Sequence, residues 1–154
     1  MHEPIKILLI DDDEDEGRIF TYALASIDSD VEFRHMINGQ EALDLLEQKF
    51  KPDIIFLDIN MPKLDGWQVL RALQSESYRD IPVIMHSSMY SIETIKKAFE
   101  DGACGFLSKI ISSADFNKIL SMLLNPSNCT NPGTINGFTL NNNRKLLIQK
   151  FETE

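Results

Sequence analysis

No apolar run in the sequence approaches the roughly 20 residues that a membrane-spanning helix needs. The first residues also lack the basic segment and the apolar stretch that together mark a secretory signal. Both absences argue against a membrane protein and against an exported one. We therefore expect a cytoplasmic protein with no membrane partner.

Cysteine is nearly absent too. Cys104 and Cys129 are the only two cysteines, and their spacing is not that of a metal site. Two isolated cysteines cannot supply the disulfide framework that holds a small secreted domain together. We interpret both as free thiols, so the fold must depend on an apolar core.

Basic residues are few as well. Lys and Arg number 15 against 24 Asp and Glu, which gives a formal net charge of −9. Proteins that bind nucleic acid take much of their affinity from basic side chains placed on phosphates. A chain that is acidic and has no basic stripe is therefore not expected to bind nucleic acid.

The sequence does contain a regular alternation of strand and helix patterns. Continuous apolar runs rich in β-branched residues indicate buried strands, whereas apolar residues three and four apart indicate helices. Strict alternation predicts an α/β fold, a five-stranded parallel sheet with helices on both faces, because parallel strands need crossover connections. The expected strands are 5–10, 31–36, 54–57, 81–86 and 105–108, and the expected helices are 15–27, 40–50, 67–74, 92–100 and 114–124.

Chemically active side chains follow four of these expected strands. Asp11 and Asp12 come after the first, Asp58 after the third, Ser87 at the end of the fourth and Lys109 after the fifth. Ligands of doubly wound sheets bind beyond the carboxyl ends of the strands. We therefore expect these five side chains to lie close together at one edge of the sheet.

Three clustered carboxylates repel one another unless a positive charge joins them. Oxygen ligands without His or Cys favour Mg²⁺, with Asp12 as a direct ligand and Asp11 as a ligand through water. Lys109 adds an ammonium suited to a phosphoryl oxygen, and Ser87 adds a hydroxyl. Together with Asp58 as nucleophile, these groups can capture a phosphoryl group as an aspartyl phosphate.

The ordered set of motifs resembles the receiver domain of two-component response regulators over residues 5–124. The resemblance implies a flavodoxin-like (βα)5 fold with strand order 2-1-3-4-5. The segments that carry it are Ile10-Asp11-Asp12, Leu57-Asp58-Ile59-Asn60-Met61-Pro62 with Asp65-Gly66, Ser87, and Gly105-Phe106-Leu107-Ser108-Lys109.

The family resemblance implies that Asp58 accepts phosphate from a histidine kinase or a histidine phosphotransfer protein. Mg²⁺ would be the required cofactor, with the main-chain carbonyl of Asn60 joining the aspartates as a ligand. The resemblance also implies that Ser87 and Phe106 move together when phosphate arrives. Their movement would change the face formed by the fourth helix, fifth strand and fifth helix, which would bind a downstream protein or a second copy of the chain.

Two positions depart from the family pattern. The family usually has proline after the lysine, joined by a cis peptide bond, whereas this chain has Ile110. A cis bond before a residue other than proline costs about 3 kcal/mol, so the sequence leaves open both the isomer of this bond and the reach of Lys109. Ser88 replaces the usual small residue after the hydroxyl, which should alter access to the phosphoryl group only modestly.

The sequence divides into an expected receiver domain, residues 1–124, and a tail, residues 125–154. The tail is too short for an independent effector domain. It could be disordered, could pack on the domain, or could form a hairpin of strands 135–140 and 146–151 turned at 141–143, with a helix over 144–151 as the alternative. We expect a stand-alone receiver that acts through protein contact.

Three other functions compete with the phosphoacceptor. An aspartate-nucleophile phosphatase of the haloacid dehalogenase type would have an acid where this chain has Asn60, so we expect catalysis only of self-phosphorylation and slow dephosphorylation. A flavodoxin-type nucleotide site conflicts with Asp11-Asp12-Asp13, which would repel a phosphate. A receiver-like scaffold that is never phosphorylated stays open because of Ile110.

Several nearby residues are expected to have structural roles only. The acids 13–16 suit a solvated helix start, and His86 suits a buried histidine whose nitrogens are satisfied. Trp67 is expected to pack, and Lys96 and Lys97 to lie on the solvated side of the fourth helix.

Overall fold

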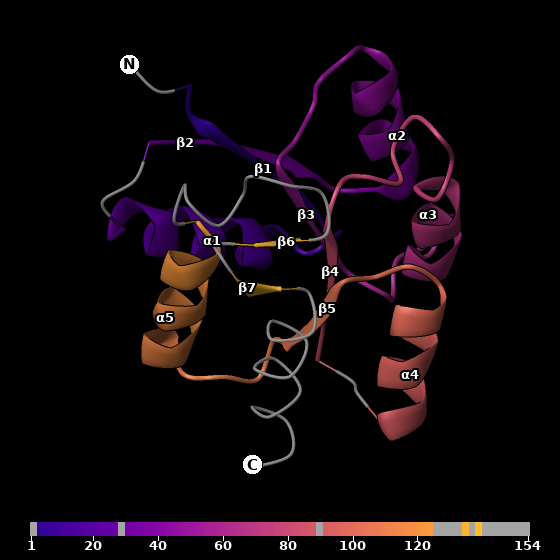
Figure 1. Cartoon of the computed structure of the whole chain (residues 1–154). Coiled ribbons are helices and arrows are strands. Elements are labelled where there is room, and N and C mark those ends of the chain that lie inside the picture. The colour runs from indigo at the N-terminus through magenta and orange to yellow at the C-terminus, as the bar shows by residue number, and fades with distance from the viewer. Residues whose placement is uncertain (1–2, 28–29, 89–90, 125–133, 136–137, 140–154) are drawn as a thin grey trace.

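A computed structural model describes residues 3–27, 30–88, 91–124, 134–135 and 138–139. Five parallel strands form one sheet in the order β2-β1-β3-β4-β5, which confirms the expected flavodoxin-like fold (Figure 1). The strands are β1 (Ile5–Ile10), β2 (Val31–Met36), β3 (Ile54–Leu57), β4 (Val83–Ser87) and β5 (Gly105–Ser108). The helices between and after them are α1 (Glu14–Ala25), α2 (Gly39–Glu47), α3 (Gly66–Ala72), α4 (Ile92–Glu100) and α5 (Ser113–Leu123).

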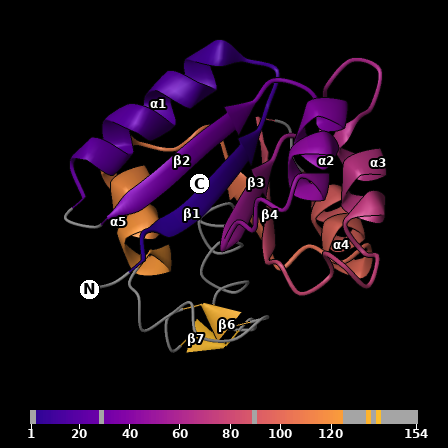
Figure 2. The same cartoon turned by 90° about the horizontal axis from the view of Figure 1, so that it is seen from above.

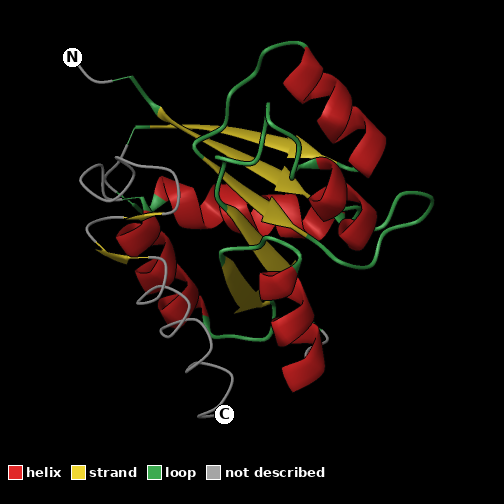
Figure 3. Cartoon of the chain, turned by 45° about the vertical axis from the view of Figure 1, so that its right-hand side comes forward, coloured by secondary structure: helices red, strands yellow, loops and turns green. Residues whose placement is uncertain are grey.

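Two apolar cores lie on opposite faces of the sheet. Helices α1 and α5 cover one face, and α2, α3 and α4 cover the other (Figures 2 and 3). Alternate residues of one strand point to opposite faces, so Leu8 and Ile10 of β1 enter the core under α2 and α3, whereas Ile7 and Leu9 enter the core under α1 and α5. Residues 7–10 of β1 and 54–57 of β3 are all buried, which explains why these two stretches are continuous apolar runs.

The strand register brings the functional residues to one edge. Ile10 of β1 pairs with Leu57 of β3, and each is followed directly by an aspartate. The main-chain N–H of Asp58 donates to the carbonyl of Ile10 at 2.9 Å, so the pairing continues to the start of the acidic loops. The side chains of Asp11 and Asp58 therefore begin at the same level of the sheet.

Polar caps set the helix starts. The side chains of Asp13, Asn38, Asp65, Ser91 and Ser112 each accept a hydrogen bond from a main-chain N–H in the first turn of the helix that follows. Capping of this kind allows a helix to begin directly after the cap. Four helices accordingly begin one residue before their expected starts, and only α4 has the expected bounds.

The described part of the tail contains two paired strands, but not those of the expected hairpin. Strands β6 (Thr134–Ile135) and β7 (Phe138–Thr139) are antiparallel, and Ile135 pairs with Phe138. The single strand expected over 135–140 is therefore wrong, because the chain reverses within that segment. The expected turn at 141–143, the second strand at 146–151 and the alternative helix at 144–151 lie outside the described residues. None of the described helices combines the length and the apolar character needed to cross a membrane.

Candidate functional site

Asp11, Asp12 and Asp58 gather at the carboxyl ends of β1 and β3. Oxygen atoms from the three carboxylates lie within 4.8 Å of one another. Asp11 and Asp58 are buried, with exposed fractions of 0% and 5%, whereas Asp12 is exposed. His35 of β2 holds the main chain here, since its Nε2 donates to the carbonyl of Asp11 at 2.7 Å. The structure thus brings together the three acids that the sequence singles out.

Lys109 reaches this cluster from the end of β5. Its Nζ lies 2.8 Å from Oδ2 of Asp11 and 3.5 Å from Oδ1 of Asp58. The Lys109–Ile110 peptide bond is trans. Hydrogen bonds hold this segment, because the N–H of Lys109 donates to the carbonyl of Ser87 and the N–H of Ile110 donates to Oγ of Ser108, both at 2.9 Å. Lys109 therefore contacts both buried acids without the proline that usually follows it.

The electrostatics of the cluster are dominated by burial. Burial, followed by the charge of Asp11, raises the pKa of Asp58 to about 7, against the lowering effect of Lys109. Burial alone would lower the pKa of Lys109, but its hydrogen bond to Asp11 and the charge of Asp11 outweigh burial and raise that pKa. One ammonium does not neutralise three carboxylates, so the cluster has room for a further positive charge.

This donor set fits Mg²⁺. The three residues offer oxygen only, one of them is open to solvent, and hard dications that keep part of their water shell take such ligands. Asn60 is exposed and lies two residues after Asp58 in the loop that follows β3. The arrangement suits a metal ion that is held by few protein ligands and shares its remaining positions with water and a phosphate oxygen.

The two expected switch residues occupy different surroundings. Ser87 ends β4 with an exposed fraction of 1%, at the same edge as the acids. Phe106 of β5 is fully buried in the core that contains α2, α3 and α4. The two residues lie on neighbouring strands, because Met85 of β4 pairs with Phe106 of β5 and Ser87 of β4 pairs with Ser108 of β5.

The start of α3 supports the loop that carries Asp58. The N–H of Gly66 donates to the carbonyl of Ile59 at 2.7 Å. A Cβ atom at Gly66 would lie 2.2 Å from the carbonyl oxygen of Asp58, so only glycine allows this close approach. Asp65 and Gln68 form a capping box that fixes the first turn of α3.

Two residues beside the acids differ from their expected roles. Glu16 is only partly exposed, and burial raises its pKa, so a fully solvated role is wrong for this acid. Its spacing of four residues before buried Phe20 is a signal for this inward position. His86 is 2% exposed and its Nδ1 has no hydrogen-bond partner among the described residues, so the expectation of a satisfied histidine is also wrong. Burial, with a contribution from the charge of Lys109, lowers the pKa of His86 to about 3.

Comparison with known proteins identifies the family to which this fold and its acidic edge belong. Residues 7–121 match the family described as the response regulator receiver domain. The chain belongs to this family. The chain is similar to the "Probable transcriptional regulator ycf27" of Porphyridium aerugineum, to which it is 32% identical over 138 residues, covering 85% of this chain and 55% of that protein. A "Protein-glutamate methylesterase/protein-glutamine glutaminase 1" of Saccharophagus degradans is 38% identical over 110 residues, 68% of this chain and 28% of that protein.

Solved structures agree with the receiver fold. The Mn(2+)-bound form of response regulator Rcp1 has a TM-score of 0.68 and 26% identity, over 77% of this chain and 90% of that one. The Vibrio cholerae chemotaxis protein CheY4 has a TM-score of 0.66 and 28% identity, over 77% of this chain and 97% of that one. The receiver matches about half or less of the length of the first curated relatives, whose full activities therefore do not transfer to it.

Proposed function

We propose that this receiver domain is a phosphoacceptor in a two-component phosphorelay, with Asp58 as the residue that is phosphorylated. The observation that carries the proposal is the buried Asp58 carboxylate beside Asp11, with the ammonium of Lys109 in contact with both. Family membership supplies the donor class, a histidine kinase or a histidine phosphotransfer protein. A cytoplasmic location belongs to the same proposal.

In this mechanism a carboxylate oxygen of Asp58 attacks the phosphorus of a phosphohistidine. The new O–P bond forms as the N–P bond to the donor imidazole breaks, and the imidazole leaves with the electron pair of that bond. Lys109 lies near Oδ1 of Asp58 and orients this carboxylate while offering its ammonium to a phosphoryl oxygen. Mg²⁺ held by Asp11, Asp12, Asp58 and the main-chain carbonyl of Asn60 would supply charge neutralisation for the phosphoryl oxygens.

The output follows from the position of the switch residues. Ser87 lies at the edge of the sheet that carries Asp58. Phe106 is buried in β5, the strand that pairs with the strand of Ser87. A hydroxyl that moves toward the phosphoryl group would leave space into which Phe106 can turn. The resulting change on the face of α4, β5 and α5 would select a downstream protein or a second copy of the chain.

Two alternatives lose support. The argument for a scaffold that is never phosphorylated was the presence of Ile110 after Lys109. Lys109 nevertheless contacts both Asp11 and Asp58, although the peptide bond that follows it is trans. A haloacid dehalogenase type phosphatase needs an acid two residues after its nucleophile, and Asn60 occupies that place. We therefore expect no turnover of a phosphate ester.

Incubation with a small phosphodonor and Mg²⁺ tests the proposal. Intact mass spectrometry should detect one phosphoryl group on the wild type, and fragmentation after reduction of the acyl phosphate should place it on Asp58. Asp58→Asn should stay unmodified, whereas Asp80→Asn, the same change at an exposed acid, should be modified as the wild type is. An unmodified wild type, or equal modification of Asp58→Asn, would overturn the assignment.

A further inference from the structure

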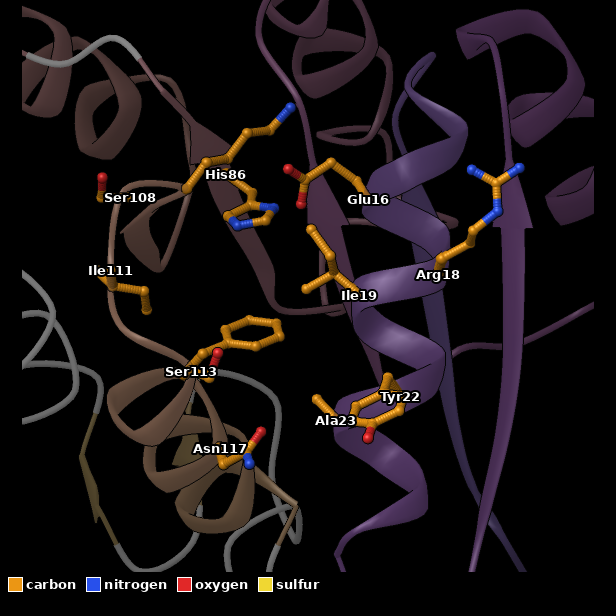
Figure 4. A pocket seen from close by; sticks show the side chains of 12 residues that line it. Glu16, Arg18, Ile19, Tyr22, Ala23, His86, Ser108, Ile111, Ser113 and Asn117 are labelled. Carbon is orange, nitrogen blue, oxygen red and sulfur yellow. The ribbon is translucent and has the colours of Figure 1, made fainter.

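A pocket of about 410 Å³ lies between α1 and α5, next to the proposed phosphorylation site, with which it shares Lys109. Ile19 and Phe116 contribute apolar walls, and Glu16, His86 and Lys109 contribute polar groups. Figure 4 shows the carboxylate of Glu16 directed toward the imidazole ring of His86. Nothing in the proposed phosphoryl transfer uses Glu16 or His86.

His86 is the group in this pocket that most needs an explanation. Its ring stacks on Phe116 with the planes 7° apart and meets Phe20 edge to face, which fixes its orientation. Despite this packing, Nδ1 is shielded from solvent and has no hydrogen-bond partner in the described part of the chain. A buried polar atom left without a partner costs about 1–3 kcal/mol. Such a cost is commonly offset when the atom binds a ligand.

The neighbours of His86 determine the charge of that ligand. Ligand atoms from Asp11, Glu16 and His86 all lie within 4.8 Å of one another. Oδ2 of Asp11 has only the ammonium of Lys109 beside it, at 2.8 Å, and makes no hydrogen bond to any other described residue. The carboxylates of Asp11 and Glu16 outnumber the ammonium of Lys109, while Arg18, which also lines the pocket, pairs with Glu14 and Asp15. The pocket therefore attracts a cation and repels an anion.

We propose that Asp11, Glu16 and His86 form a second cation site, specific for a divalent transition-metal ion such as Zn²⁺. A neutral imidazole with two carboxylates is a ligand set that Zn²⁺ accepts, and imidazole distinguishes such ions from Mg²⁺. The metal ion competes with the ammonium of Lys109 for Asp11, because both cations need the same carboxylate. Binding at this site does not require that Asp58 accept phosphate, so the inference stands apart from the proposed function.

Titration calorimetry of the full chain with Zn²⁺ tests the site. Glu16→Gln and His86→Leu should each weaken Zn²⁺ binding about tenfold or more. Glu14→Gln makes the same change at an exposed acid two residues earlier and should bind Zn²⁺ as the wild type does. Glu16→Gln keeps the test valid if His86→Leu disturbs the core, since Glu16 lies at the edge of the fold. No Zn²⁺ binding by the wild type, or equal binding by wild type and Glu16→Gln, would overturn the proposal.

Competition provides a readout that a merely structural role would not move. Lys109→Met removes the competing ammonium and should bind Zn²⁺ more tightly than the wild type, and adding Glu16→Gln should reverse that gain. A gain that survives Glu16→Gln would place the ion at Asp11, Asp12 and Asp58 instead and overturn the site. Imidazole NMR resonances of His86 should shift on addition of Zn²⁺ and stay unshifted with Mg²⁺. A His86 signal indifferent to Zn²⁺ would also overturn the site. Mg²⁺ binding by Glu16→Gln should be retained, so a failure of Mg²⁺ binding would concern the phosphorylation site instead.

Discussion

Asp58 is more costly to ionise in the folded protein than in the unfolded chain. Burial and the charge of Asp11 raise its pKa from 3.8 to about 7, against the opposing effect of Lys109. A raised pKa of a carboxyl group contributes stability that is fully present below the unfolded value and is lost as the pH rises through the folded value. In the absence of Mg²⁺, the free energy of unfolding should therefore fall between about pH 4 and pH 7 through this group.

Replacing Asp58 by Asn should stabilise the metal-free protein at pH 8, because the amide carries no charge to bury. We expect the free energy of unfolding to rise by roughly 1–3 kcal/mol at pH 8. The gain should shrink at pH 5.5, where Asp58 of the folded wild type is protonated. Urea denaturation at the two pH values measures both effects, and Asp80→Asn should show neither. A gain of equal size at both pH values would mean that the charge of Asp58 is not its cause.

For single residues, the sequence predicts those positions that follow from the order and direction of the strands. Asp11, Asp58 and Lys109 each follow a buried strand, and parallel strands must end at one edge. The sequence cannot show that Nδ1 of His86 lacks a hydrogen-bond partner. This depends on the packing of Phe20 and Phe116 around the ring, and these two residues come from helices far apart in the sequence. The inward position of Glu16 is also hard to predict, because Glu16 belongs to a run of acids that otherwise suits a solvated helix start.

Helix α3 acts as a support for the phosphorylation loop. Its capping box fixes Asp65, and the next residue, Gly66, donates to the carbonyl of Ile59, directly after Asp58. Further along the helix, the ring of Trp67 lies 4.4 Å from Nζ of Lys97, which also pairs with Asp101. Lys97 is therefore partnered rather than free in solvent, and it joins α3 to α4.

Loss of the α3 cap should harm both stability and the site. Asp65→Ala should lower the free energy of unfolding by about 1 kcal/mol, the usual effect of losing an N-cap. It should also weaken Mg²⁺ binding, because the main chain after Asp58 depends on the first turn of α3. Ser112→Ala removes the cap of α5 and should cost similar stability while leaving Mg²⁺ affinity unchanged. Calorimetric Mg²⁺ titrations of the two variants would count against this role for α3 if they gave equal affinities.

Helix starts show where sequence prediction loses accuracy at the scale of an element. Apolar spacing locates a helix by its buried face, and the first buried side chain often lies a few residues inside the true start. The caps Asn38 and Ser112 set the start instead, one residue before their helices begin. The capping side chains therefore set the first residues of α2 and α5, whereas apolar spacing predicts that these helices exist.

The whole molecule combines two cores that share one sheet. Among the residues that the structure describes, the fully buried members of both cores lie between Ile7 and Leu124. The acidic edge lies within the same span, since its residues belong to the ends of β1, β3 and β5. Under the proposed division into a receiver of 1–124 and a tail of 125–154, we predict that these elements suffice for folding and metal binding.

A chain truncated after Asn128 tests this division. Four residues are kept beyond Leu124 so that the new terminal carboxylate is not placed on a buried side chain. We expect one cooperative unfolding transition in urea, with a free energy of unfolding within about 1 kcal/mol of that of the full chain, and a Mg²⁺ affinity equal to that of the full chain. Loss of cooperative unfolding would mean that the tail packs on a core and belongs to the domain. Unchanged stability with altered oligomeric state would instead assign the tail a role in contact between copies, because neither core then depends on it.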